Sequence, residues 1–448
     1  MSKYTKVTII GAGSIIFSRQ MMESLLMFDD IVIDELALVD IDSRKLDVME
    51  RVAKRMVSQV NKRTKVTASV NRRDVLPGSS YVINSIGVGS PELYEQELLI
   101  ADRYGVVQSV GDIIGPTGIF RMLRAYPAML DICRDMEELC PDAYFFNYTN
   151  PMAPLTLALS RQTTIKVFGF CHSVQGTAME IAGYLGVDVS RLSYWAAGIN
   201  HMSWYLDLKL DGEDAYPRMR EIAANRKTID ERSKFDGAYA QMLNGDFSDA
   251  VRFEIMKHFG YYVSESPFHM SEYVPYFRKN SEMIKEWNVE RRWWLESEKS
   301  RDSVIDHLEA LLSSGEPLPM SITPEYAPEV IRANLTGNIF RANLNVCNNG
   351  LITNFPDDCC VEVPCFVDTE GIHPCSVGEL PVGVAGLNMS NISVHRAMAQ
   401  AAVSKEKRYI YEAVKLDPLT ASQCTLEQIE ALTDELIALN DEYLRDFR

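Results

Sequence analysis

The chain opens with a short apolar run, a glycine turn and a helical pattern, and this order strongly limits the fold. The run is Lys6–Ile10, the turn is Gly11-Ala12-Gly13-Ser14, and residues 15–27 carry apolar side chains at helical spacing. A strand, a tight glycine turn and a helix are typical of the first unit of a dinucleotide-binding sheet. Because Ile16 occupies the third glycine position of the usual fingerprint, the turn alone also suits an α/β protein without a nucleotide.

Four later features favour the nucleotide. A second apolar run, 36–39, ends in Asp40, whose carboxylate could accept hydrogen bonds from a ribose and would repel the 2′-phosphate of NADP. Three more apolar runs each end in polar residues, which are Asn84, Asn147 to Asn150, and Cys171 to Ser173. Each polar end alone is typical of a turn or a helix cap. Together they predict a site, because the carboxyl ends of parallel strands meet at one edge of a sheet.

This pattern predicts an α/β fold, with an N-terminal Rossmann-like doubly wound sheet and an interleaved α+β C-terminal domain. A chain of 448 residues exceeds the roughly 250 to 300 residues that one core usually supports. We therefore expect an NAD-binding domain over 1–195 and a substrate-binding and oligomerisation domain over 196–448. From about residue 196 we expect helices broken by polar turns, then a β-rich stretch over 339–367 and a helical tail with an amphipathic run over 394–414.

Charge and composition exclude several kinds of partner. The net charge of −17 argues against nucleic acid, which needs a basic footprint. No signal peptide pattern and no apolar run of about 18 residues is found, which predicts a cytoplasmic chain with no membrane partner. Nine cysteines in a chain of this length do not make a dense disulfide framework, and cytosolic thiols are usually reduced.

Cys171 and His201 are candidate metal ligands. Cys171 directly follows a predicted strand and precedes a helical pattern, a position that could lower the pKa of its thiol. His201 follows a turn of small residues. Their separation is not diagnostic of a zinc site, and each residue alone is more often part of a core. Cys359, Cys360 and Cys365 lie in an apolar run and are expected in the core.

Several blocks of sequence resemble glycoside hydrolase family 4. They are Gly-Ala-Gly-Ser at 11–14, Asn-Tyr-Thr-Asn-Pro-Met at 147–152, Cys-His-Ser-Val-Gln-Gly-Thr at 171–177, Gly-Ile-Asn-His-Met at 198–202 and Val-Glu-Val-Pro-Cys at 361–365. The resemblance runs from about residue 5 to about residue 440. Within the family the chain is similar to the α-galactosidase, or melibiase, branch.

The resemblance implies an unusual glycosidase mechanism. Bound NAD oxidises the sugar at C3, which acidifies the proton at C2, and a divalent ion, usually manganese, chelates the oxygens at C2 and C3. The aglycone leaves from C1 by elimination, water adds, and the hydride returns to C3. By position, Cys171 and His201 match the metal ligands and Asn150 matches a polar residue near the nicotinamide and the sugar. Asn84 is expected beside the cofactor and Asn200 beside the substrate.

The resemblance leaves the acid and the base open. Several relatives carry an aspartate after the metal-binding cysteine, where this chain has His172. His172 and Asp112 are therefore candidates for protonating the leaving group or for supporting the site. The base that removes the C2 proton is a tyrosine in some relatives, and Tyr273 is the candidate here. Tyrosines in such a segment are equally typical of the edge of a core.

The substrate follows mainly from the resemblance, which implies α-galactosides. No basic cluster suited to a 6-phosphate is found, whereas the loose arginines Arg121 and Arg252 keep α-glucuronides and sulfoquinovosides open, beside α-glucosides. The family is oligomeric, so a homodimer or homotetramer is expected. Two other classes compete with this reading: a 2-hydroxyacid dehydrogenase with net cofactor turnover, and a catalytically silent NAD-binding sensor.

Overall fold

The computed structural model describes residues 4–233, 248–291 and 294–448. Twelve strands pair into one sheet in the order β3-β2-β1-β4-β5-β6-β10-β11-β7-β8-β9, with β12 paired to β11. The first six strands pair in parallel; they are β1 (Lys6–Ile10), β2 (Glu35–Val39), β3 (Lys65–Ser69), β4 (Tyr81–Asn84), β5 (Tyr144–Asn147) and β6 (Lys166–Phe170). This 3-2-1-4-5-6 order is that of the doubly wound dinucleotide-binding fold, so the predicted fold class is confirmed.

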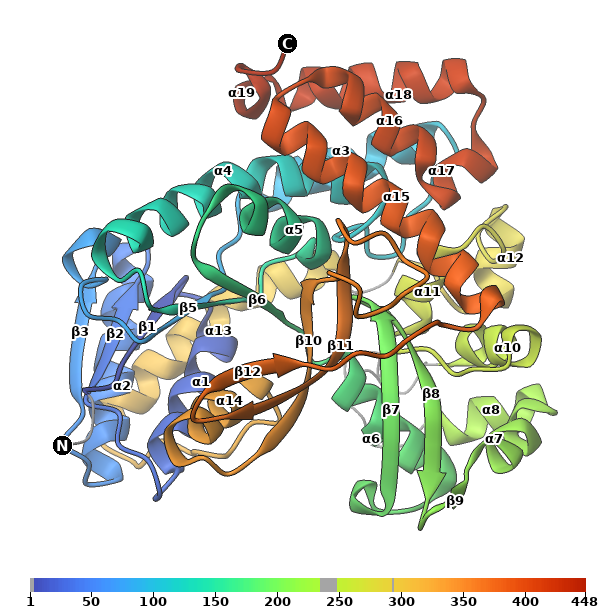
Figure 1. Cartoon of the computed structure of the whole chain (residues 1–448). Coiled ribbons are helices and arrows are strands. Elements are labelled where there is room, and N and C mark those ends of the chain that lie inside the picture. Colours follow the sequence, from blue (N-terminus) through green and yellow to red (C-terminus); the bar gives the residue numbers. More distant parts are fainter. Residues whose placement is uncertain (1–3, 234–247, 292–293) are drawn as a thin grey trace.

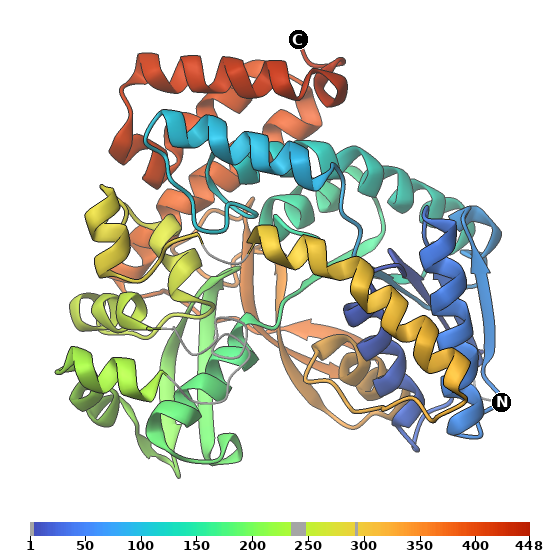
Figure 2. The ribbon, with the colours of Figure 1, turned by 180° about the vertical axis from the view of Figure 1, so that it is seen from behind.

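Helices cover both faces of the parallel strands, with α1 and α2 on one side and α4 and α5 on the other (Figures 1 and 2). The helices that connect these strands are α1 (Ile15–Met27), α2 (Ser43–Gln59), α3 (Pro91–Arg103), α4 (Gly115–Leu139), α5 (Met152–Gln162) and α6 (Ser173–Leu185). The strand order reverses between β1 and β4, so the crevice in which such folds bind ligands lies beyond the carboxyl ends of these two strands.

The second half adds antiparallel strands to the same sheet. They are β7 (Leu192–Ile199), β8 (Met202–Leu210), β9 (Glu213–Asp214), β10 (Phe340–Cys347), β11 (Cys360–Asp368) and β12 (Gly371–Pro374). The hairpin of β7 and β8 corrects the expectation of helices from residue 196. The last four residues of β7 are all buried, because the strand is covered on both faces there, and this burial hides the period-two alternation that reveals a strand.

One of the remaining helices, α13 (Trp294–Ser314), packs on α2 and α3, and the others lie mainly around this antiparallel part and at the C-terminus. The others are α7 (Tyr216–Ala223), α8 (Arg226–Arg232), α10 (Ala250–Phe259), α11 (Pro267–Tyr273), α12 (Ser281–Glu286), α14 (Tyr326–Thr336), α15 (Val382–Ser404), α16 (Lys407–Leu416), α17 (Pro418–Gln423), α18 (Leu426–Leu439) and α19 (Asp441–Leu444). The amphipathic run predicted over 394–414 is two helices, because Lys405 adopts a left-handed backbone with φ of 56° and ends α15.

The two halves of the chain share their interior. One cluster of buried apolar side chains includes Val7 of β1 and Phe447 near the C-terminus, and a smaller cluster lies between α6, α7 and the β7–β8 hairpin. Strand β7 runs across residue 195, so the division into 1–195 and 196–448 stays a prediction. Cys359, Cys360 and Cys365 are buried as expected. Among the described helices, none is both long and apolar enough to cross a membrane.

Candidate active site

The glycine turn after β1 touches the loop after β4. Gly11 has φ of +86°, and a Cβ on it would lie 2.9 Å from the backbone carbon of Ser85. Only glycine tolerates both the left-handed backbone and this close approach. The Gly13 N–H donates to Oδ2 of Asp40 at 2.6 Å, so the end of β2 holds the turn, and Ser14 precedes α1 as its N-cap. The predicted cofactor residues Gly11, Gly13, Ser14 and Asp40 thus lie together.

Asn84 lies at the next strand end along the switch point. Its Nδ2 donates to Oδ1 of Asn147 at 3.2 Å and to Oγ1 of Thr149 at 3.1 Å. Its Oδ1 is buried and has no partner among the described residues, and the same is true of Oδ1 of Asn150. A buried amide oxygen without a partner costs free energy, so these two atoms point to a ligand or to ordered water at this edge.

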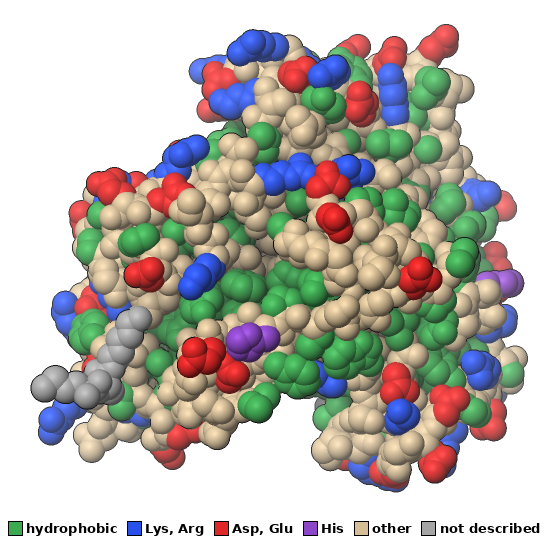
Figure 3. Space-filling view, viewed as in Figure 1, with side chains coloured by type: hydrophobic (Ala, Val, Ile, Leu, Met, Phe, Trp, Pro, Cys, Tyr) green, Lys and Arg blue, Asp and Glu red, His purple; other side chains and the backbone are tan. Residues whose placement is uncertain are grey.

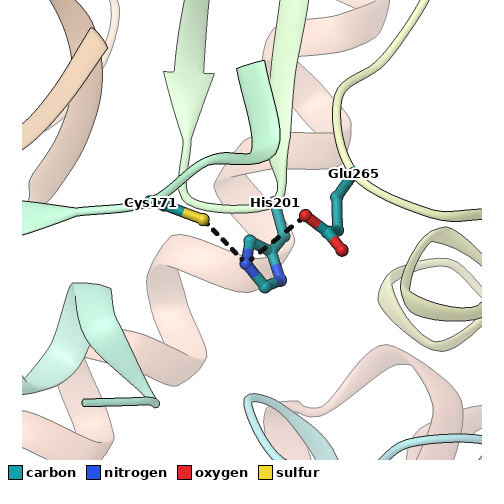
Figure 4. A group of neighbouring side chains, drawn as sticks. All are labelled: Cys171, His201 and Glu265. Atoms are coloured by element: carbon teal, nitrogen blue, oxygen red, sulfur yellow. Dashed lines mark hydrogen bonds and ion pairs between the residues drawn. The ribbon is translucent and has the colours of Figure 1, made fainter. Parts of the chain in front are cut away.

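A cysteine, a histidine and a glutamate converge beyond β6 (Figure 4). Cys171 follows β6, His201 lies in the turn between β7 and β8, and Glu265 precedes α11. Sγ of Cys171 lies 3.2 Å from Nε2 of His201, which lies 3.8 Å from Oε2 of Glu265. One ligand atom from each residue lies within 4.8 Å of the others, and all three residues are buried.

The donors of this cluster suit a divalent ion. Thiolate, imidazole and carboxylate form a mixed set in which the glutamate oxygen favours a harder ion, such as manganese, more than sulfur and nitrogen alone would. His201 and Glu265 both have left-handed backbones, with φ of 61° and 70°. Such a conformation costs about 1 to 3 kcal/mol for a non-glycine residue and is found mostly at functional sites. The donor types and the strained backbones of this cluster therefore both fit a bound divalent ion.

The pKa of the Cys171 thiol shifts in the opposite direction to the one predicted from the sequence. Burial, with Glu265 and Glu362 adding to it, raises the pKa of Cys171 well above its usual value. This shift is opposite to the expected lowering, because the thiol is buried and carboxylates from distant segments of the chain add to the effect of burial. Burial lowers the pKa of His201 to about 4, which keeps the imidazole neutral and able to bind a metal.

Asp112 reaches the cluster through His269. Nε2 of His269 lies 3.3 Å from Oδ1 of Asp112, and Nδ1 lies 3.5 Å from Oε1 of Glu265. Burial raises the pKa of Asp112, but its pairing with His269 outweighs this and lowers the pKa to about 2. Burial conversely lowers the pKa of His269, but Asp112 raises it to about 9. Asp112 is therefore ionised here, which favours a supporting role over that of proton donor.

Tyr273 and Asn200 both carry buried polar atoms without a partner among the described residues. The Tyr273 hydroxyl, both amide atoms of Asn200 and Nδ1 of His201 are buried without a hydrogen-bond partner in the described ranges. Burial, with Asp112 and Glu272 adding to it, raises the pKa of Tyr273 well above its usual value. A bound cation would oppose this rise. Four unsatisfied atoms beside one cluster are the mark of a binding site.

His172 pairs with Glu325. Its Nδ1 lies 3.1 Å from Oε1 of Glu325, which precedes α14, and 59% of its side chain is exposed. Desolvation lowers the pKa of His172, whereas the hydrogen bond with Glu325 raises it by more, to about 9. Solvent screens this pair more than the buried ones. The pairing leaves Nε2 as the ring nitrogen that can face a substrate.

The two arginines considered for an acidic sugar have different surroundings. Arg252 is fully buried and paired with Asp249 and Glu180, so the expectation that it is a loose cation is wrong. Nε of Arg121 donates to the carbonyl oxygen of Asn150 at 3.3 Å. Arg121 therefore lies beside the predicted site, whereas Arg252 is committed to carboxylates of the interior.

Sequence reasoning missed Glu265, His269 and Glu325. Glu265 and His269 lie four residues apart, but Glu265 is 64 positions from His201, and no spacing rule links residues brought together by a helix and a hairpin. The left-handed backbone of Glu265 has no signal in the sequence, since glycine or asparagine would be the usual residue there. Glu325 and His172 are still farther apart along the chain.

The sheet order and its polar carboxyl edge place the chain among enzymes built on the dinucleotide-binding fold. Comparisons with known proteins narrow this class. The model of the family 4 glycosyl hydrolases matches residues 6–187 and that of their C-terminal domain matches 196–420. The chain therefore belongs to glycosyl hydrolase family 4, and it is a glycoside hydrolase.

Relatives and solved structures agree over the whole chain. The α-galactosidase of Bacillus subtilis is 36% identical over 99% of this chain and 100% of its own length. A solved structure described as a glucosidase of Bacillus subtilis has a TM-score of 0.87 at 27% identity and covers 97% of this chain and 99% of its own. A 6-phospho-α-glucosidase from gut microorganisms, solved with NAD and Mn²⁺, has a TM-score of 0.82 at 19% identity over the full length of both chains.

Proposed function

We propose that this chain cleaves α-galactosides with NAD and a divalent ion, manganese, as cofactors. The observation that carries the proposal is the convergence of Cys171, His201 and Glu265 beyond β6, at the carboxyl edge of a dinucleotide-type sheet. The choice of α-galactosides is supported by the relative that is 36% identical over nearly the whole chain. Family membership also favours a hydrolase over the plain dehydrogenase and over the silent sensor.

The two cofactors would be held by separate groups. Gly11, Gly13, Ser14, Asp40 and Asn84 would hold NAD, and Cys171, His201 and Glu265 would hold the metal. When bound, NAD supplies reversible oxidation at C3 of the sugar, and the ion supplies Lewis acidity toward the sugar oxygens. Asn150 lies between the two groups in the sheet, because β5 lies between β4 and β6. Its unpartnered amide oxygen suits a hydroxyl of the sugar or the cofactor amide.

The remaining polar residues would handle protons and orientation. Tyr273 would take the proton from C2 as its phenolate, a form that a bound cation would favour. Nε2 of His172 would give a proton to the glycosidic oxygen while Glu325 holds Nδ1. The two free amide atoms of Asn200 would bind sugar hydroxyls. Asp112 would act through His269, which contacts both Asp112 and Glu265.

Other α-glycosides remain the alternatives to galactosides. Glucuronides and sulfoquinovosides carry an anion near C6 and need a cation there. The burial and pairing of Arg252 weaken this alternative. Arg121, which lies beside Asn150, is the arginine that could bind such an anion. An α-glucoside differs from an α-galactoside only in the orientation of one hydroxyl, so assays rather than charge must separate these two.

A panel of nitrophenyl glycosides tests the function. With NAD, manganese and a thiol reductant, we expect aglycone release from p-nitrophenyl α-galactoside without steady accumulation of NADH, because the hydride returns to the sugar in each turnover. Omitting manganese should lower the rate by about 10³-fold or more, since a Lewis acid contributes several kcal/mol. α-Glucosides, α-glucuronides, sulfoquinovosides and 6-phosphosugars complete the panel. Steady formation of NADH with no aglycone would instead identify a dehydrogenase.

The chain is also proposed to act as a homodimer or homotetramer in the cytoplasm. All nine cysteines are free, as a reducing compartment requires. Hydrophobic side chains gather over the hollowed front face (Figure 3). Large apolar residues are exposed near the antiparallel strands, and they are Ile339 at 73%, Phe366 at 42% and Val382 at 88%. Exposed apolar surface of this kind often marks an interface.

Light scattering on the purified protein tests the assembly. We expect the mass of a dimer or tetramer, and Phe366→Asp should shift it toward the monomer, because a charge buried in an apolar interface is unfavourable. Leu426→Asp, at a residue 65% exposed on α18, is the matched control and should keep the native mass. A native protein that is monomeric at every concentration would contradict the assembly.

A further inference from the structure

The backbone of Glu265 is held from both sides by two buried residues. Oγ1 of Thr177 accepts a hydrogen bond from the Glu265 N–H at 3.0 Å, and Nη1 of Arg252 donates to the Glu265 carbonyl oxygen. Nη1 of Arg252 also donates to Oγ1 of Thr177 at 3.2 Å. Thr177, Arg252 and the Glu265 backbone are therefore joined pairwise by hydrogen bonds. The φ of Glu265 is 70°, which is unfavourable for most residues other than glycine.

Arg252 is itself fixed by buried acceptors. Its Nε and Nη2 donate to the two carboxylate oxygens of Asp249 at 2.6 and 2.8 Å, and Nη2 donates to Oε2 of Glu180 at 2.6 Å. The side chains of Arg252 and Asp249 are both fully buried. The hydroxyls of Tyr184 and Tyr262 donate to Asp249 in turn. A bidentate, buried arginine has little freedom, so it can hold the Glu265 carbonyl in one place.

Thr177 connects this network to the rest of the metal cluster. It lies in α6, which begins two residues after Cys171. Thr177 ends the sequence block 171–177, and the proposed chemistry gives it no role. Glu180 lies one turn later on the same helix. Cys171 thus lies just before α6, and the first two turns of this helix carry Thr177, which binds Glu265, and Glu180, which binds Arg252.

We propose that Thr177 and Arg252 are positioning residues that hold Glu265 in its left-handed conformation and thereby set the affinity of the cluster for its divalent ion. This inference rests on the proposed metal site. Without the two hydrogen bonds the Glu265 backbone would relax toward ordinary φ values, which would rotate the carboxylate away from His201. A network that only neutralised buried charge would not affect the affinity for metal.

Titration of the NAD-loaded protein with manganese tests the inference. Free Mn²⁺ is measured by electron paramagnetic resonance, so activity is not needed. Thr177→Val removes the acceptor but keeps the shape, and we expect the dissociation constant for Mn²⁺ to rise about tenfold, since a lost buried hydrogen bond also leaves the Glu265 N–H unpaired. Thr177→Ser should restore native affinity. Thr433→Val, which removes a buried hydroxyl of α18, should leave the affinity unchanged.

A double-mutant cycle separates positioning from general damage. In the Glu265→Gln background, Thr177→Val should add no further loss of affinity, because its effect passes through that carboxylate. Arg252→Lys keeps the buried positive charge but loses the planar guanidinium, and it should weaken Mn²⁺ binding in the same way. This variant provides the test if Thr177→Val does not fold. Native affinity in both variants, or losses that add to that of Glu265→Gln, would overturn the inference. Native affinity in Glu265→Gln would instead overturn the proposed ligand set.

Discussion

Cys171→Ser is expected to abolish glycosidase activity while leaving NAD binding intact. The hydroxyl of serine is a poor ligand for a divalent ion compared with a thiolate, and Cys171 is one of the three donors that converge there among the described residues. A bound Lewis acid contributes several kcal/mol to the transition state, so we expect kcat to fall by about 10³-fold or more. The rate of aglycone release at saturating manganese measures the effect.

The control for this substitution is Cys375→Ser, which changes a half-buried cysteine next to β12. It should keep native activity, whereas both variants should bind NAD with native affinity and unfold at the native temperature. If Cys171→Ser kept full activity, the thiol would have no part in catalysis. Full loss of NAD binding in Cys171→Ser would show damage to the sheet rather than to the metal cluster.

The elements that sequence reasoning predicts well are those with a local signal. The helical spacing over 15–27 matches α1 residue for residue, because a helix on one face of a sheet keeps its apolar stripe. The strand ends carrying Gly11, Asn84 and Cys171 lie at one edge of the sheet, since parallel strands with right-handed crossovers leave little other choice. The fold, and the edge of the sheet at which the cofactor is expected, therefore follow from local patterns combined with the rule that these crossovers are right-handed.

The rest of the site depends on contacts that no local pattern encodes. Glu265 joins Cys171 only because α10, α11 and the β7–β8 hairpin place it there. The raised pKa of the Cys171 thiol results mainly from burial, and carboxylates at 265 and 362, far away in the sequence, add to it. A prediction from the strand end alone therefore names Cys171 as a candidate ligand but gives the wrong direction for the pKa of its thiol. For Arg252 only one partner is hidden in this way: Glu180 comes from α6, whereas Asp249 lies three residues before the arginine.

Tyr273→Phe is expected to lower kcat strongly without destabilising the fold. If Tyr273 removes the C2 proton as its phenolate, the loss of that oxygen should cost about 10²- to 10⁴-fold in kcat, as for other general bases. The hydroxyl is buried and has no hydrogen-bond partner in the described part of the chain. Removing such a group breaks no bond and removes a desolvation penalty of about 1 to 3 kcal/mol, so the free energy of unfolding should stay the same or rise.

Tyr216→Phe gives the opposite pattern and serves as the control. The Tyr216 hydroxyl is also buried, but it donates to the Tyr205 carbonyl oxygen and accepts from the Tyr262 N–H. Its removal should lower the free energy of unfolding by about 1 kcal/mol and leave kcat native. Deuterium at C2 of the substrate adds a second readout, because Tyr273→Phe should enlarge the isotope effect by making proton removal rate-limiting. A Tyr273→Phe variant with native kcat and an unchanged isotope effect would assign the base to another residue, and the unpartnered hydroxyl would then serve substrate binding alone.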